Sequence, residues 1–210
     1  MKKIIILVCL FVFCTAVSAQ LHMREVFAQL PDSVLPLMSK NNRLDCIDFI
    51  ENGMEARVKN HFGDPVILDS LTHDYLLLHT SELGYVEMKL LSKAPDTLLC
   101  VNRTYYGPVA DSEVRIYDAS WSFIAVVRRP DFGQFFKTSG ETGKWQVEEL
   151  DTLRMIRSEA EVLPLMKASL SSEPGKVEWV LQTAGFSKEL KKVASRYLQP
   201  VICDLLSFCR

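Results

Sequence analysis

The sequence predicts an α+β fold in which N-terminal helices pack on an antiparallel β-meander, followed by a hairpin, a helix and a final strand. Three observations lead to this fold class. Apolar residues recur at helical spacing before residue 56, and short apolar runs then alternate with turn residues at intervals of roughly ten residues. Strands and helices do not alternate along the chain, which argues against a parallel sheet.

The chain begins with the three-part pattern of a secretory signal peptide. Two lysines precede an unbroken apolar run over residues 4–13, and Val17 and Ala19 place small or modest side chains ahead of Gln20. The apolar run is about half of the roughly 20 residues that a spanning helix needs. A membrane anchor is therefore less favoured than a cleaved signal peptide. A lipoprotein is also disfavoured, because it needs a small residue directly before the acylated cysteine, whereas Val8 precedes Cys9 and Phe13 precedes Cys14.

We expect residues 1–19 to be a cleaved signal peptide and residues 20–210 to form a single α+β domain, within which 20–130 and 131–210 could be sub-lobes. The composition is that of an ordinary globular protein, with 48% hydrophobic and 24% charged residues, which disfavours disorder, collagen and coiled coil. The formal charge of −2 gives no electrostatic footprint for nucleic acid. Contact with a membrane is expected only through the signal peptide.

Two helices are expected first. One covers residues 23–30 and stops at Pro31, and a clearer one follows over 43–54 with Asn41 or Asn42 as its N-cap. The apolar residues of the second helix lie three and four apart, which predicts one buried stripe. That stripe consists of Leu44, Ile47, Ile50 and Met54.

Six short strands are expected to form the meander. In the run 84–91, Val86, Met88 and Leu90 alternate with Glu87 and Lys89, which is typical of a strand with one face in water. The turn residues between the runs predict hairpin connections. The six runs are 66–71, 74–80, 84–91, 96–106, 113–120 and 121–127.

The last third of the chain mixes elements. Residues 129–144 predict an irregular linker, and apolar residues at every third position from 147 to 156 suggest a short helix. A hairpin is expected around Pro174-Gly175, because Pro-Gly favours a turn. Ser187 should cap a helix that ends before Pro200, and an apolar strand over 201–208 should close the chain.

Three segments, residues 41–63, 71–91 and 107–121, resemble an uncharacterised family of secreted Bacteroidales proteins, catalogued as domain of unknown function 3256. The resemblance extends over most of the chain after the leader. It implies export from a Gram-negative cell and a place in the periplasm or the cell envelope. It implies no activity, cofactor or catalytic residue.

No metal site or cofactor is expected from the four histidines, His22, His61, His73 and His79. His73 and His79 would share one face of a strand but lie about 20 Å apart, whereas zinc needs each nitrogen at about 2.1 Å. His22 would lie near the new N-terminus after cleavage.

Four cysteines follow the leader, namely Cys46, Cys100, Cys203 and Cys209. No CxxC motif occurs, so zinc ribbons and thioredoxin-like motifs are not indicated. An exported chain could form disulfides in three connectivities. Apolar neighbours favour Cys46 and Cys100 as core residues, because a free cysteine behaves as a small apolar side chain.

Two groups of residues are candidates for binding. Phe132, Phe135 and Phe136 lie in the linker among Gly and Gln, so their rings could form an exposed platform for a peptide or sugar. Arg43, Asp45 and Asp48 lie on one helix, where they could hold it to the sheet through ion pairs. Most helical carboxylates simply face solvent.

Nucleophile elbows, phosphate loops and other catalytic motifs are missing from the sequence. The function that the sequence favours is therefore a non-catalytic binding or assembly module, with an envelope protein or a glycan as its partner. The alternative is a hydrolase of envelope or dietary polymers, with two carboxylates brought together only in the fold. Such an enzyme would need a deep pocket with two carboxylates about 5–10 Å apart.

Overall fold

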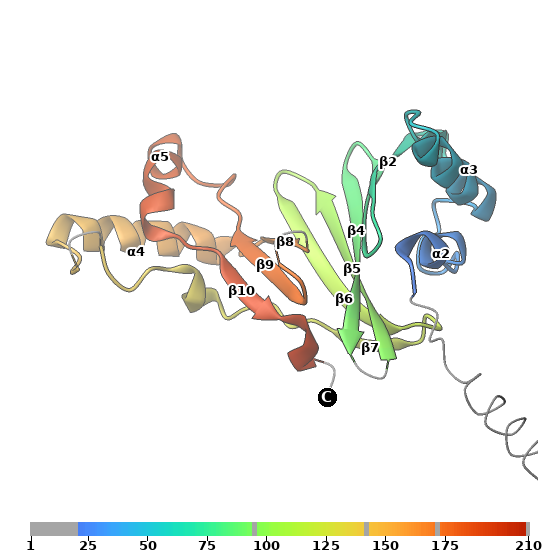
Figure 1. The fold of residues 1–210 in the computed structure, drawn as a ribbon. Helices are drawn as coiled ribbons and strands as arrows, with labels where there is room; N and C mark the ends of the chain where they lie inside the picture. Colours follow the sequence, from blue (N-terminus) through green and yellow to red (C-terminus); the bar gives the residue numbers. More distant parts are fainter. Residues whose placement is uncertain (1–20, 94–95, 141–142, 171–172, 209–210) are drawn as a thin grey trace, which may run out of the picture.

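A computed structural model describes residues 21–93, 96–140, 143–170 and 173–208. The expected signal peptide and Cys209 lie outside the described residues. The described chain forms two sheets with helices at both ends of an elongated molecule (Figure 1). The helices are α2 (Met23–Ala28), α3 (Lys40–Glu51), η1 (Phe132–Phe135), α4 (Val147–Val162), α5 (Lys188–Tyr197) and η2 (Leu205–Phe208). The strands are β1 (Arg57–Lys59), β2 (Pro65–Leu71), β3 (Tyr75–Ser81), β4 (Gly84–Lys93), β5 (Asp96–Tyr106), β6 (Ala110–Asp118), β7 (Phe123–Val126), β8 (Met166–Ser169), β9 (Lys176–Leu181) and β10 (Val201–Asp204).

The larger sheet is an antiparallel meander of seven strands in the order of the sequence, from β1 to β7. The predicted meander is therefore confirmed. The six predicted runs correspond to β2 through β7, and the strand predicted over 96–106 has the bounds of β5. β1 was not predicted, because three residues are too few to show an alternating pattern.

Helices α2 and α3 cover one face of the large sheet (Figure 1). Phe27 and Ile47 pack there with Leu78 and Val101, which point from the sheet toward the helices. The predicted N-cap of the second helix is wrong, since Ser39 takes that place and its hydroxyl accepts a hydrogen bond from the amide of Asn42 at 3.2 Å.

The predicted buried stripe of α3 is only partly correct. Ile47 is buried and Ile50 is half-buried, but Leu44 and Met54 are 43% and 51% exposed. Arg43 and Cys46 are buried in their place. The buried face of the helix is therefore rotated relative to the apolar pattern. A charged side chain is buried without a large penalty only where it has hydrogen-bond partners, and Arg43 has them in two backbone carbonyls.

The smaller sheet packs on the opposite face of the large one, with strand order β10-β9-β8. Its hairpin and the Ser187 cap of α5 are as predicted. Helix α4 is longer than the short helix expected, with 16 residues. The final strand is shorter than expected, because the chain turns into η2 at Leu205.

One hydrophobic cluster joins both sheets. Cys100, Val114 and Ile116 of the large sheet meet Ala168 and Trp179 of the small one, and all five are buried. The segments before and after residue 130 thus share a core. Among the described residues, no helix combines the length and the apolar character needed to cross a bilayer.

Candidate functional site

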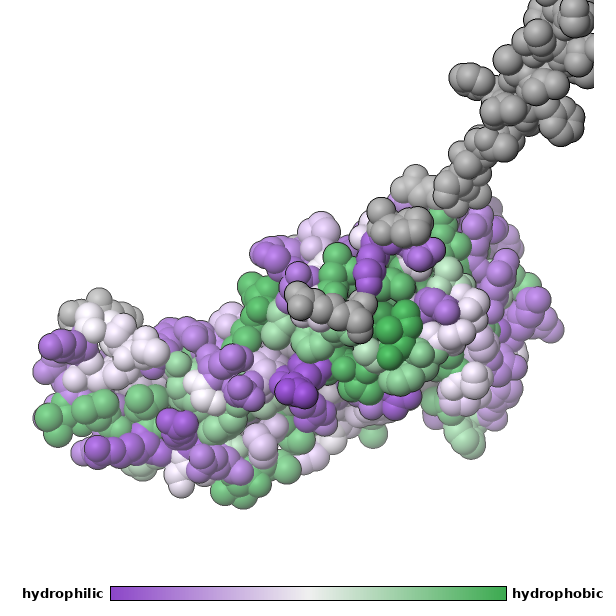
Figure 2. Space-filling view, turned by 90° about the horizontal axis from the view of Figure 1, so that it is seen from below, coloured by the Kyte–Doolittle hydropathy of each residue, from purple (hydrophilic) through white to green (hydrophobic). Residues whose placement is uncertain are grey.

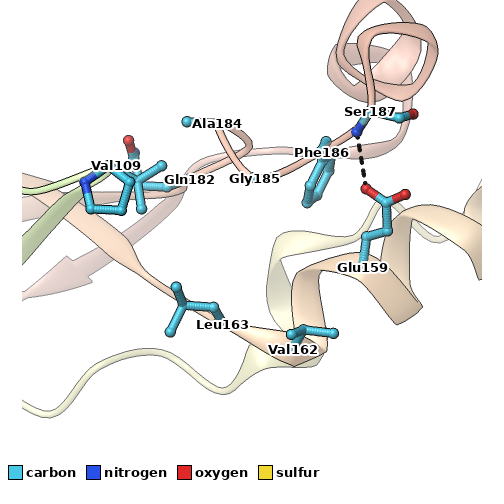
Figure 3. Close-up of a pocket in the computed structure, with 10 residues that line it drawn as sticks. Val109, Glu159, Val162, Leu163, Gln182, Ala184, Gly185, Phe186 and Ser187 are labelled. Atoms are coloured by element: carbon cyan, nitrogen blue, oxygen red, sulfur yellow. Dashed lines mark hydrogen bonds between the residues drawn. The ribbon is translucent and has the colours of Figure 1, made fainter.

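A pocket of about 400 Å³ opens where three segments meet (Figure 3). The turn between β5 and β6 forms one wall, the C-terminal end of α4 forms another, and the loop from β9 to α5 forms the third. A pocket of this size falls in the range of sites that bind small ligands or side chains. Its lining residues are Pro108, Val109, Glu159, Val162, Leu163, Gln182, Ala184, Gly185, Phe186 and Ser187.

Local sequence explains why the pocket forms. Helix α4 ends at Val162 because Leu163 precedes Pro164, and the residue before a proline is disfavoured in a helix. The loop after β9 is fixed by Phe186, which is buried. The amide of Phe186 also donates to the carbonyl of Thr183 at 3.0 Å. The Phe186 ring forms a wall of the pocket facing the end of α4 (Figure 3).

Two polar side chains of the pocket make hydrogen bonds at its wall. Glu159 is its one ionisable lining residue, and its carboxylate accepts a hydrogen bond from the amide of Ser187 at 3.2 Å (Figure 3). Ser187 is the N-cap of α5, where a negative charge is favourable. The side-chain amide of Gln182 donates to the carbonyl of Val180 at 3.2 Å. The remaining walls are mainly apolar.

The apolar character continues onto the rim of the pocket. Val162 is 84% exposed and Leu163 is 56% exposed. Adjacent exposed aliphatic side chains next to an apolar pocket are typical of a surface that contacts another molecule.

A second hollow of about 400 Å³ lies at the end of β4 and the start of β5. Hydrophobic residues gather in the middle of the face shown in Figure 2, where the ends of β4, β5 and β10 lie. Leu90, Leu91 and Leu206 line the hollow together with His73 and Asp74. Asp74 is ion-paired with Lys89 at 3.2 Å.

The exposed aromatic platform expected in the linker is not formed. Phe135 is fully buried, Phe136 is 7% exposed and Phe132 is half-buried. Phe132 and Phe136 pack edge to face, with ring centroids 5.0 Å apart. The expectation of exposure is wrong because these rings pack against the hydrophobic cluster to which the small sheet contributes.

The expectation that α3 forms ion pairs with the sheet is also wrong. Arg43 pairs with Asp32 at 3.0 Å, not with the sheet. Asp45 and Asp48 are exposed, and the carboxylate of Asp48 is 3.4 Å from the side-chain amide of Asn52. The three residues are not brought together as one site.

The sequence missed a buried polar network centred on Glu87, which is 4% exposed. Its carboxylate accepts hydrogen bonds from Tyr75 at 3.0 Å, from Asn102 at 2.7 Å and from the amide of Leu170 at 3.3 Å. Burial and the nearby Glu87 raise the pKa of the Tyr75 hydroxyl above its usual range. The alternating pattern placed Glu87 on a water-facing side, but the small sheet covers that side.

The core role of Cys46 and Cys100 is confirmed. Both are fully buried, and they lie in separate clusters on opposite faces of the large sheet. Burial raises the pKa of the Cys46 thiol to about 12. Cys203 is half-buried, and burial raises its thiol pKa as well.

The carboxylates of the described residues are spread over several hollows. The two hollows of about 400 Å³ each have a single carboxylate in their lining, Glu159 and Asp74. Asp64 and Glu82 line one notch together, but it lies between two surface turns. Within the described ranges, no group of three or more His, Cys, Asp or Glu residues is placed to hold a metal ion.

The comparisons with known proteins give a family and a similar fold. The model of a family described as "Protein of unknown function (DUF3256)" matches residues 15–203. The fold is similar to that of a domain of an uncharacterized protein from Porphyromonas gingivalis W83, with a TM-score of 0.66 and 22% sequence identity. The similarity covers 87% of this chain and 92% of that one. No curated protein matches the chain.

Proposed function

This chain belongs to the DUF3256 family, and from that premise we propose that it is an exported envelope protein that binds a partner protein without catalysing a reaction. The pocket at the end of α4 is the binding site, and it accepts an aliphatic or aromatic side chain of the partner. Export follows from the signal-peptide pattern over residues 1–19. The protein then acts in the periplasm or at the cell surface.

One observation carries the binding role. The pocket is apolar, and Glu159, its one ionisable group, is already held by the amide of Ser187. Hydrolysis by paired carboxylates needs two such groups in one pocket, whereas this lining supplies one, which accepts a hydrogen bond at the start of α5. A sugar would need several free polar groups in the lining, so an apolar side chain fits better than a glycan.

The test uses two matched substitutions on α4. Val162→Asp puts a charge at the rim of the pocket, whereas Val147→Asp puts the same charge at the far end of the same helix, where Val147 is 71% exposed. A photo-crosslinking residue at position 163 is then activated in native envelopes. We expect one defined partner peptide, rich in apolar residues, to be captured in the wild type and with Val147→Asp.

Val162→Asp should lose that adduct, because an aspartate would have to be desolvated to accommodate the partner. The proposal is wrong if the same adducts form with both substitutions. It is also wrong if position 163 crosslinks only to lipid or to unrelated proteins in proportion to their abundance.

A further inference from the structure

Strand β7 is an edge of the large sheet that has an exposed apolar surface and carries no charged residue. Phe123, Ile124 and Val126 are each at least 40% exposed. The opposite edge of the same sheet, β1, carries Arg57 and Lys59 on either side of a single valine. Charged residues on an edge strand are a common device against pairing with other chains. One edge of this sheet therefore has the device, and the other does not.

The main chain of β7 has hydrogen-bonding groups directed away from the sheet. The amide of Val127 donates to the carbonyl of Val114 at 2.9 Å, and Val126 lies opposite Arg115 in the ladder. Consecutive residues of a strand direct their main-chain groups to opposite sides, so the N–H and C=O of Val126 point to the free edge. A strand added to this edge would bond to these groups.

Two apolar side chains of β7 share one face of the sheet. Phe123 and Val126 lie opposite Tyr117 and Arg115, and the side chains of paired residues point to the same face. The rings of Phe123 and Tyr117 contact edge to face, with centroids 6.0 Å apart. Phe123 and Val126 nevertheless remain exposed. A further strand along this edge would cover both side chains with cross-strand neighbours.

The two ends of β7 are flanked by opposite charges. Arg128 is exposed shortly after the strand, and Asp118 begins the turn that precedes it. Hydrogen bonds from the hydroxyl of Ser120 and from the amides of Ser120 and Ser122 hold the pKa of the Asp118 carboxyl below its usual range. Within the described ranges, neither Arg128 nor Asp118 takes part in an ion pair.

We propose that β7 pairs antiparallel with β7 of a second copy of this chain, so that the two large sheets become one continuous sheet around a twofold axis. An antiparallel pair places the end of one strand beside the start of the other, so Arg128 of each copy lies next to Asp118 of the second copy. A parallel pair would instead bring the two arginines together. The twofold axis repeats every contact, so this edge is complementary to itself in both apolar surface and charge.

The test is sedimentation equilibrium of the full chain as the cell processes it, over a wide range of protein concentrations. We expect a reversible equilibrium between monomer and dimer, because a strand of four residues supplies few main-chain bonds. Val126→Lys gives β7 the kind of charge that β1 carries and should weaken the dimer by more than about 30-fold, since it acts in both copies. Val180→Lys puts the same charge on an exposed position of β9 and should change nothing.

A second variant tests the charges without altering the strand. Arg128→Glu should weaken the dimer by about 10-fold, because two carboxylates then face each other at each end of the pair. The wild-type dimer should weaken as salt is added, whereas the variant dimer should not. Arg128 is exposed, so the variant should fold as the wild type does, which circular dichroism verifies for every variant.

Amide exchange locates the interface. The amide of Val126 should exchange faster on dilution, whereas the amide of Val127, which bonds to Val114 of its own chain, should not respond to concentration. The proposal is wrong if the chain is a monomer at every concentration, or if neither substitution at Val126 or Arg128 weakens the dimer. A photo-crosslink from position 124 to a different protein in native envelopes would also refute a second copy as the occupant.

The dimer and the proposed function are tested separately. None of the residues substituted here lines the pocket at the end of α4. If the dimer is refuted and the crosslink from position 163 depends on Val162 as expected, only the pairing of β7 fails. If the dimer forms and that crosslink does not, only the proposed binding site fails.

Discussion

Arg43 shows how a single buried charge organises its surroundings. Its side chain is only 2% exposed. Its guanidinium donates hydrogen bonds to the carbonyls of Leu30 and Met38, at 2.7 and 2.8 Å. Asp32, its ionic partner, remains 76% exposed. Arg43 therefore satisfies backbone carbonyls of the segment between α2 and α3 that would otherwise be buried without partners.

Replacing Arg43 by Met should lower the free energy of unfolding by about 2–4 kcal/mol, because two buried carbonyls lose their donors. Asp32→Asn should cost less than about 1 kcal/mol, since the carboxylate is exposed and its ion pair is weak. Urea unfolding followed by circular dichroism measures both. Equal losses in the two variants would contradict the role given to the carbonyls.

The sequence identified Arg43 as a residue of interest but not its partners. Helical periodicity describes which side chains share a face. The choice between Arg43 and Leu44 as the buried residue depends instead on carbonyls outside the helix, at Met38 and Leu30. The same limit applies to the contact between His22 and His73, whose Nδ1 atoms are 2.7 Å apart although the residues are 51 positions apart in the chain. No local pattern connects two such residues.

Strand β8 is stabilised by side chains along its free edge. Its amides at Met166 and Ala168 donate to Asp111 and to the hydroxyl of Ser112, at 3.2 and 2.9 Å. The carbonyl of Ala168 accepts from the side-chain amide of Asn102 at 3.0 Å. An edge strand with unpaired backbone groups is prone to aggregate, and here the face of the large sheet pairs those groups.

Ser112→Ala should lower the free energy of unfolding by about 1–3 kcal/mol, because the buried amide of Ala168 and the hydroxyl of Thr104 both lose a partner. Amide exchange at Ala168 should accelerate more than exchange in β2. Ser122→Ala, on an exposed turn, is the control and should be nearly neutral. Unchanged protection of Ala168 would show that the hydroxyl is not its partner in solution.

At this scale the sequence predicted much of the fold. Turn residues and alternation located β2 through β7 and the β8–β9 hairpin, because each depends on contacts between near neighbours in the chain. What covers the second face of the sheet depends on residues more than 50 positions later. The alternating pattern therefore predicted correctly that Glu87 lies on a strand, but wrongly that its side chain faces solvent.

At the scale of the whole molecule, the two sheets share one hydrophobic cluster. Their common cluster includes Trp179, which is fully buried, and residues from both sides of position 130. A shared apolar core links the stability of the two parts, whereas separate lobes with a polar interface would unfold independently.

Trp179→Ala should lower the free energy of unfolding by about 3–5 kcal/mol, since a large buried ring leaves a cavity. Amide exchange in β5 should accelerate together with exchange in β9. Val180→Ala, on the same strand but 43% exposed, should cost far less. Two separate transitions, or loss of protection in the small sheet alone, would refute the shared core.

The sequential order of the seven strands also determines the order in which contacts can form. Each strand of the meander pairs with the next one in the chain, so the large sheet can assemble by short-range zippering, which costs little loop entropy. The hydrogen bonds between β8 and the large sheet join residues 55 to 66 positions apart. A chain that emerges N-terminus first thus completes the platform before the strand that docks on it has appeared.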